Sequence, residues 1–184
     1  MADTFVHRLM GAAMLDTTTF EEIEADRSAT PQALAVVVLS SAAAAIGARD
    51  LGTAAAWSFF ATAGALALMT WAAFALLTFE IGARILPTSD TRTNVGELLR
   101  TLGFAATPGL IQVFGVFPGL RWPTFAMAIC WAFAASVIAV RQALDYTSTR
   151  RALAVCGLGL TLAFVIAAVL GMMFSTPLSG FSGA

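Results

Sequence analysis

The sequence predicts an all-α, polytopic membrane protein: a bundle of five transmembrane helices preceded by short N-terminal amphipathic helices. Of its 184 residues, 59% are hydrophobic and 11% are charged, whereas an ordinary soluble domain has roughly 45–50% and about 25%. Too few charges remain to cover a soluble domain of this size. After a polar N-terminal segment come five long apolar stretches, each close to the ~20 residues that cross a bilayer. The ten basic residues are all Arg and fall mainly in alternate connections between these stretches.

Residues 1–30 are expected to form a cytoplasmic amphipathic segment. Apolar side chains recur there at helical spacing, namely Phe5, Val6, Leu9, Met10, Ala13 and Met14. This pattern predicts a short helix, which lies either on the membrane surface or packed under the cytoplasmic end of the bundle. A second short helix is expected next, because Thr18 with Glu21, and Thr19 with Glu22, fit a capping box.

The predicted membrane domain, residues 31–175, contains the five apolar stretches. They run approximately over residues 31–48, 53–79, 98–120, 123–140 and 152–174. An amphipathic tail extends the second to Leu86, and a helix of these 34 residues would be about 51 Å long. The hydrocarbon core is only about 30 Å thick, so this helix tilts strongly or projects from the membrane. In the loop 87–97, Asn94 and Glu97 predict the cap of the third helix.

The Arg residues predict the orientation. If the stretches cross the membrane in turn, one side holds Arg8, Arg27, Arg84, Arg92, Arg100, Arg141, Arg150 and Arg151, and the other holds only Arg49 and Arg121. By the positive-inside rule the first side is cytoplasmic. The N-terminus is then cytoplasmic, and residues 176–184 form a short extracytoplasmic tail.

Five ionisable residues near the predicted cytoplasmic boundary form the first candidate site: Glu80, Arg84, Arg100, Arg141 and Asp145. Glu80 and Arg84 have the spacing and order that favour an ion pair on a helix, and Arg141 and Asp145 repeat the spacing in reverse order. Because ionisable groups at membrane depth need partners, such a cluster would bind lipid headgroups or a partner protein. Alternatively, both pairs simply lie at the interface, with the Arg side chains extending to the headgroups.

A helix break at Thr107, Pro108 and Gly109, followed by Gln112, is the second candidate site. Proline lacks an N–H donor and clashes with the preceding turn, which predicts a kink or break near Thr107. Discontinuous helices line substrate sites in transporters, but many membrane helices accept a kink that only shapes packing. Gln112 is expected to hydrogen-bond across helices.

Residue types that perform chemistry are scarce in this sequence. One histidine, His7, and two cysteines, Cys130 and Cys156, cannot supply a zinc site at the usual spacings, and both cysteines are expected to be free. We find no nucleophile–base pair, phosphate-binding glycine loop or metal motif, so no catalytic residue and no cofactor are predicted. A net charge of −1 argues against nucleic-acid binding.

Three segments carry a family resemblance: MLDTTTFEEIEADRSATPQA from Met14, ELLRTLGFAATPGLI from Glu97, and RQALDYTSTRRALAV from Arg141. In this order they resemble the Yip domain family of Ypt/Rab-interacting membrane proteins. The resemblance implies a five-helix membrane bundle with a cytosolic N-terminus. Eukaryotic relatives bind Rab-type GTPases or act in membrane shaping through a long cytosolic N-terminal region. Since the short segment here has no counterpart of that region's longer motif, a Rab-type GTPase is not an expected partner.

These inferences lead to one main function and one rival. The Arg-only, Ala-rich composition indicates a high-GC genome and a bacterial inner-membrane protein. We expect a non-enzymatic scaffold, lipid-organising protein or accessory subunit, with membrane lipids and either another protein or further copies of itself as partners. The rival is a small transporter or channel built around the Pro108–Gly109 break, and a lipid-modifying membrane enzyme ranks third. A transporter needs polar residues around a midplane cavity, whereas a scaffold is expected to have a filled apolar core.

Overall fold

The computed structural model describes residues 2–48, 56–87 and 93–175, and in these ranges the chain is helical apart from short connections. The helices are α1 (Ala2–Ala13), α2 (Thr17–Ala25), η1 (Arg27–Ala29), α3 (Thr30–Gly47), α4 (Ala56–Phe79), η2 (Glu80–Ile85), α5 (Val95–Phe104), η3 (Thr107–Val116), α6 (Arg121–Ala143) and α7 (Thr149–Ser175). η1 and η3 are 3₁₀ helices, and η2 is a π-helical turn. The predicted all-α class is confirmed. The predicted tail, residues 176–184, lies outside the described residues, as do Arg49 and Arg92.

Four helices in the described ranges are long and apolar enough to cross a membrane: Arg27–Gly47, Ala65–Ile85, Arg121–Ala143 and Thr149–Ile166. The chain is therefore a multi-pass membrane protein. The third predicted stretch, 98–120, is not a single helix, because it divides into α5 and η3. A count of five spans stays a prediction in which this divided segment supplies the remaining crossing.

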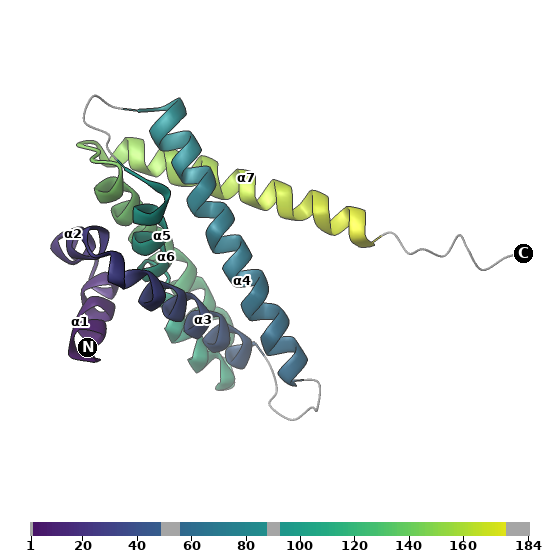
Figure 1. Ribbon diagram of the computed structural model, residues 1–184. Helices are drawn as coiled ribbons and strands as arrows, with labels where there is room; N and C mark the ends of the chain where they lie inside the picture. Colours follow the sequence, from purple (N-terminus) through teal and green to yellow (C-terminus); the bar gives the residue numbers. More distant parts are fainter. Residues whose placement is uncertain (1, 49–55, 88–92, 176–184) are drawn as a thin grey trace, which may run out of the picture.

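The centre of the bundle consists of α3, α5 with η3, and α6 (Figure 1). η3 packs against α3 on one side and against α6 on the other. α4 crosses this centre, and α7 runs out beside it and carries the C-terminal end away from the other helices. α1 and α2 lie against the side of the bundle, at the end opposite the C-terminus.

Glycines let α5 and η3 approach α3 closely. A Cβ on Gly103 would lie 2.6 Å from the Cβ of Ala33, and a Cβ on Gly115 would lie 2.8 Å from the carbonyl oxygen of Gly47. Between them, a Cβ on Gly109 would lie 3.1 Å from the Cβ of Ser40. Small residues at a helix interface allow the backbones to come together, which is the main source of packing energy between helices in lipid.

The cap of α2 differs from the predicted one. Asp16 is the N-cap residue, and its side chain accepts a hydrogen bond from the backbone N–H of Thr18 and another from the hydroxyl of Thr19. The helix therefore begins at Thr17, before both predicted cap residues, because the Asp16 carboxylate is the stronger acceptor for the free N–H groups. At α5 the predicted capping box of Asn94 and Glu97 is confirmed.

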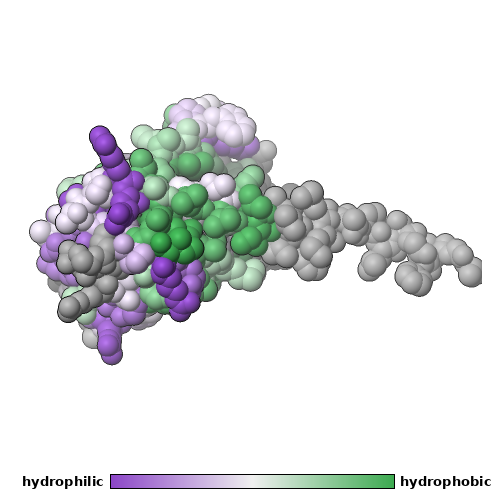
Figure 2. Space-filling model, turned by 90° about the horizontal axis from the view of Figure 1, so that it is seen from above, coloured by the Kyte–Doolittle hydropathy of each residue, from purple (hydrophilic) through white to green (hydrophobic). Residues whose placement is uncertain are grey.

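The buried core lies where the N-terminal helices meet α5, the end of α6 and the start of α7. Phe20, Ile23, Leu98, Phe104 and Leu144 are fully enclosed there. Large apolar side chains farther along the spans point outward, among them Leu66, Met69, Leu158, Phe164 and Ile166. Figure 2 shows hydrophobic residues across the middle of one face and most of the hydrophilic residues gathered at one end. An extensive apolar surface of this kind fits contact with lipid.

Candidate functional site

Glu80 and Arg84 form an ion pair on the π-helical turn η2. Arg84 Nη1 lies 2.9 Å from Glu80 Oε2, and the guanidinium also lies over the ring of Phe79, 5.6 Å from its centre. Both charged side chains are largely exposed. Because an exposed pair adds little to stability, these charges remain available to a headgroup or a protein. π-helical turns are rare and occur frequently at functional sites.

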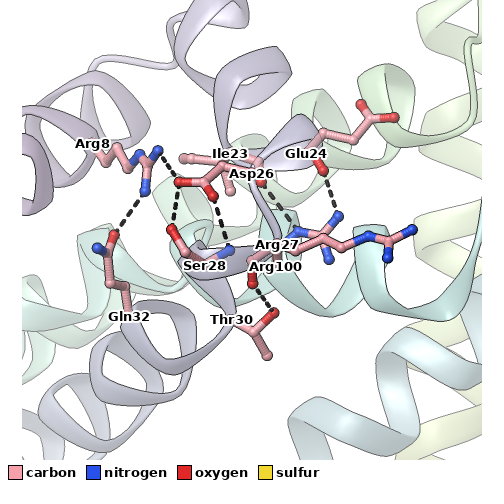
Figure 3. A network of polar contacts seen from close by, with 9 residues as sticks. All are labelled: Arg8, Ile23, Glu24, Asp26, Arg27, Ser28, Thr30, Gln32 and Arg100. Atoms are coloured by element: carbon pink, nitrogen blue, oxygen red, sulfur yellow. Dashed lines mark hydrogen bonds and ion pairs between the residues drawn. The ribbon is translucent and has the colours of Figure 1, made fainter.

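Arg100 does not join that pair, because it is buried against the N-terminal helices. Its Nε donates a hydrogen bond to the carbonyl oxygen of Ile23 at 3.2 Å, and an Nη donates to the carbonyl oxygen of Glu24. These carbonyl groups belong to the last turn of α2, where the helix leaves them without partners of its own. Arg100 therefore ties α2 to α5 (Figure 3).

Arg141 and Asp145 do not form the ion pair that their spacing suggested, since the described residues contain no salt bridge between them. An i,i+4 pair needs a continuous helix, but α6 ends at Ala143 and Asp145 has a φ of 52°. Arg141 Nε instead donates to the carbonyl oxygen of Tyr146 at 3.2 Å. Asp145 is exposed in the tight turn before α7.

Tyr146 connects this turn to the end of α4. Its hydroxyl lies 2.8 Å from the carbonyl oxygen of Gly82 and 2.9 Å from that of Leu86, and it donates to either one. Hydrogen bonds thus connect Arg141 to Tyr146, and Tyr146 to the carbonyl groups of η2 and Leu86. The five predicted residues therefore do not form one cluster. Glu80 pairs with Arg84, Arg141 contacts Tyr146, Arg100 contacts α2, and Asp145 is exposed in the turn.

A partly buried ion pair, between a buried Arg8 and a half-exposed Asp26, holds α1 to the segment that precedes α3 (Figure 3). Arg8 Nη2 lies 2.6 Å from Asp26 Oδ2, and Arg8 Nη1 donates to Gln32 Oε1 at 3.0 Å. Asp26 also accepts hydrogen bonds from the backbone N–H and the hydroxyl of Ser28. The hydrogen bonds from the Ser28 hydroxyl and from Arg8 lower the pKa of Asp26 to about 2, so this carboxylate stays charged at any physiological pH.

Glu24 is a second acidic group at this end of the chain. Partial burial, together with the negative charges of Glu97 and Asp145, raises its pKa to about 7 against the opposing effect of Arg100. A carboxyl group with such a pKa exchanges its proton near neutral pH. The charges of two predicted residues, Arg100 and Asp145, therefore both act on the pKa of Glu24, in opposite directions. The sequence pattern did not indicate Glu24 itself.

The helix break lies at Ala105 and Ala106, between α5 and η3, and Thr107 and Pro108 are the first two residues of η3. Pro108 has no N–H to offer to the carbonyl oxygen of Phe104, and the hydroxyl of Thr107 donates to that oxygen at 2.6 Å instead. The carbonyl oxygen of Ala106 accepts from Gly109 N at 2.9 Å and from Ser40 Oγ at 2.8 Å. Nearby hydroxyl and backbone groups thus satisfy the carbonyl oxygens of Phe104 and Ala106 at the break, as irregular backbone at membrane depth requires.

A cavity of about 680 Å³ adjoins the break and is lined by residues of α3, α4, α5, η3, α6 and α7. Gly109 and Gln112 form part of its wall on η3, and Trp71 and Phe74 form part of its wall on α4. Among the described residues, the lining contains hydroxyl groups, such as that of Ser41, but no charged side chain. The space beside the helix break is therefore a largely apolar cavity that is open to the surface.

A sequence model of the Yip1 domain matches residues 14–170. The chain belongs to the Yip1 domain family. The matched region includes α2, the helix break, the cavity and all five residues of the predicted polar cluster. No curated protein and no solved structure matches the chain.

Within the described part of this Yip1 domain protein, no group of three or more His, Cys, Asp and Glu side chains is placed to hold a metal ion. Cys130 is exposed on α6, and Cys156 is buried on α7. Both are free, as predicted. Cys156 Sγ lies 3.6 Å from the carbonyl oxygen of Ser136 and donates to it.

Sequence reasoning missed the residues that fasten this Yip1 domain together at its polar end, namely Arg8, Asp26, Gln32, Glu24 and Tyr146. Their partners lie far away in the chain: 18 residues separate Arg8 from Asp26, and 64 separate Tyr146 from Gly82. Helical periodicity detects only neighbours three or four residues apart. One signal was available, because Arg8 stands in an amphipathic helix with no acidic residue four positions away.

Proposed function

We propose that this Yip1 domain protein is a non-enzymatic membrane protein that organises lipid, either alone or as a scaffold or accessory subunit of a membrane complex. The main support for this proposal is the position of helix α1. It packs along the side of the bundle and turns a row of apolar side chains outward. A helix in such a position lies among lipids rather than in the aqueous phase.

Two contacts define the level of α1 on the bundle. The rings of Phe5 and Phe104 pack edge to face with their centres 6.3 Å apart, and Trp131 Nε1 donates to the carbonyl oxygen of Ala13 at 2.8 Å. Trp131 lies 12 residues before the end of α6, which corresponds to about 18 Å of helix. α1 therefore meets the bundle where α5 ends and at the middle of α6, which favours a position at the side of the bundle over one beneath it.

The outward row consists of Val6, Met10 and Met14, which are 51%, 54% and 72% exposed. They are spaced four residues apart and so share one face of the helix. On the opposite face, Leu9 packs against the core and Ala12 is fully buried. If α6 crosses the bilayer, this row faces the lipid beside the bundle. An amphipathic helix embedded on the cytoplasmic side displaces lipid in that leaflet only.

Reconstitution into vesicles tests this proposal. At equal protein-to-lipid ratio, the wild-type protein is expected to give smaller, more curved vesicles than the variant Val6→Ser/Met10→Ser/Met14→Ser, with diameters measured by electron cryomicroscopy. The matched control is Thr4→Ser/His7→Ser, which changes two exposed polar residues of the same helix and is expected to behave like the wild type. Equal diameters for the wild type, the triple variant and protein-free vesicles would refute a lipid-organising role for α1.

We also propose that the exposed members of the polar cluster contact lipid headgroups or a partner protein. Glu80, Arg84 and Asp145 are exposed at the polar end, whereas Arg100 is engaged with α2. Glu80→Ala/Asp145→Ala is expected to reduce the proteins or lipids retained during affinity purification in mild detergent. Glu22→Ala, an exposed acid on α2, is the control. Unchanged retention at normal expression would count against this contact.

The proposed setting is a bacterial inner membrane, with the N-terminus in the cytoplasm and the C-terminus outside. Eight of the ten Arg residues fall on the side assigned to the cytoplasm, which supports this orientation. Among the described residues, Arg84 lies on η2, which continues α4, and Arg150 lies at the start of α7. The end of α4 and the start of α7 lie at one end of the bundle (Figure 1).

Transport is the second candidate, and one observation favours it: the break residue Gly109 and the nearby Gln112 both line the cavity. The absence of charged side chains from this lining makes a hydrated ion path unfavourable. A flux assay in proteoliposomes distinguishes the candidates, because a lipid-organising protein does not raise the permeability to ions or small solutes.

A further inference from the structure

The cavity opens toward the surface that a bilayer would cover. Leu66 on α4 and Ile129 on α6 line it, and they are 59% and 63% exposed. Residues deeper in the wall, such as Phe74 and Ala105, are buried. Apolar cavities do not hold water well, so in a membrane the available filler for this space is hydrocarbon. This open cavity has a volume of about 680 Å³, which is within the range of small-ligand sites.

Two polar groups in the wall lack protein partners. Trp71 Nε1 is buried and has no acceptor in the described part of the chain. The carboxamide of Gln112 makes no hydrogen bond within the described ranges, and its Oε1 lies 3.9 Å from the point where a Cβ on Gly109 would be. Keeping Trp71 Nε1 from water without a partner is costly, so the preferred ligand carries an oxygen that accepts a hydrogen bond.

From these features we infer that the cavity binds one acyl chain of a membrane phospholipid, with an ester carbonyl near Gln112 or Trp71. The chain enters between α4 and α6 and fills the space beside the helix break. This site is separate from the outward row of α1, since Val6, Met10 and Met14 do not line the cavity. The two proposals can therefore fail independently.

Trp71 provides the measurement. In a variant with Trp57→Phe, Trp122→Phe and Trp131→Phe, Trp71 is the sole tryptophan and its fluorescence reports on the cavity. The protein in dodecylmaltoside micelles is titrated with phosphatidylglycerol whose oleoyl chains are brominated, because bromine quenches tryptophan at short range. The expected result is quenching that saturates at about one lipid per protein. Quenching that rises without saturation, as for random mixing in the micelle, would overturn the site.

Filling the cavity provides the second measurement. Ala132→Phe adds a ring to the wall on α6, and Ala126→Phe adds the same ring at an exposed position of that helix outside the cavity. Ala132→Phe is expected to abolish saturable quenching, while Ala126→Phe leaves it unchanged. If Ala132→Phe does not fold, Ala67→Phe on α4 serves the same purpose. Saturable quenching that survives in a folded filled variant would contradict the proposal.

The ester contact is tested with Gln112→Leu, which removes the hydrogen-bonding group at similar size. Affinity for the ester-linked brominated lipid is expected to fall roughly threefold to tenfold, the effect of one hydrogen bond. Affinity for an ether-linked analogue with the same brominated chains is expected to stay the same. Equal affinity of wild type and Gln112→Leu for the ester-linked lipid would remove Gln112 from the site.

Discussion

The pairing of Arg8 with Asp26 determines how the first helix attaches to the rest of the protein. Arg8 is 6% exposed and its Nε has no acceptor in the described ranges, so its charge depends on Asp26 and Gln32 for compensation. A buried charge that loses its partner costs far more than the pair contributes. Removing Asp26 alone is therefore expected to cost more stability than removing both charges together.

Asp26→Ala is expected to lower the Tm in detergent by about 5 °C, because it leaves the Arg8 guanidinium buried without a counter-charge. Arg8→Leu/Asp26→Ala, which removes both charges and keeps an apolar side chain, is expected to recover part of this loss. The comparison is made by thermal unfolding followed by circular dichroism. A double variant that is less stable than Asp26→Ala would contradict this account of the pair.

Glu24 predicts a pH dependence of stability. Its pKa is about 7 in the folded protein, against 4.5 as the reference value, so between these pH values the folded state holds a proton that the unfolded chain releases. The free energy of unfolding therefore falls as the pH rises through this interval and levels off above pH 7. Glu24→Gln is expected to be more stable than the wild type at pH 8 and equally stable at pH 4. Glu22→Gln, an exposed neighbour on α2, is the control, and an equal gain for both variants at pH 8 would argue against this origin.

At the scale of single residues, the sequence allows prediction of contacts within a turn of helix and little beyond. The Glu80–Arg84 pair and the Asn94–Glu97 capping box depend only on local spacing, and both are present. The Arg141–Asp145 pair fails because the spacing does not reveal that α6 stops at Ala143. The acceptors of Arg100 are backbone carbonyl groups of another helix, and no residue type marks them in advance.

At the scale of helices, the packing of α3 against α5 and η3 requires the helix backbones to come very close together. Gly103 faces Ala33 with no room for a side chain. Gly157, in the interior of α7, has open space around the corresponding position. The same substitution at these two glycines therefore separates the effect of packing from the effect of helix propensity.

Gly103→Ala is expected to reduce the free energy of unfolding by roughly 1–3 kcal/mol, since α3 must move to accommodate the added methyl group. Gly157→Ala is expected to be neutral or to stabilise by up to about 1 kcal/mol, as alanine replaces glycine within a helix. Thermal or denaturant unfolding in detergent measures both. Similar effects at the two positions would show that close packing of α3 is not what Gly103 provides.

The sequence predicts most of the helices but not how one of them divides. Length and hydropathy locate α3, α4, α6 and α7 well, because each is a long apolar run. Pro108 predicts an interruption, but the ten residues of 3₁₀ helix that follow depend on Ser40 and Thr107 satisfying the freed carbonyl groups. The cavity results from the packing of α3 to α7 around that segment, and a periodic pattern in one helix carries no information about it.

For the whole molecule, the proposed orientation rests on the Arg distribution alone. An alkaline phosphatase fusion after Asp90 is expected to be inactive, because the α4–α5 connection is assigned to the cytoplasm. A fusion after Arg121 is expected to be active. The reverse pattern, with activity at position 90, would overturn the orientation and with it the assignment of α1 to the cytoplasmic leaflet.

The central claim is that α1 lies in lipid, and a spin label at Met10 tests it most directly. Cys130 and Cys156 are first replaced by Ala, single cysteines are introduced at Met10, Ser28 or Phe164, and each labelled protein is reconstituted in bilayers. Ser28 is exposed beside the Asp26 network, and Phe164 is 74% exposed on α7, so they provide the aqueous and the lipid reference. If α1 lies in lipid, the Met10 label is expected to behave like the label at Phe164. It then collides readily with oxygen and seldom with a water-soluble nickel chelate. A Met10 label as accessible to nickel as the label at Ser28 would contradict the claim.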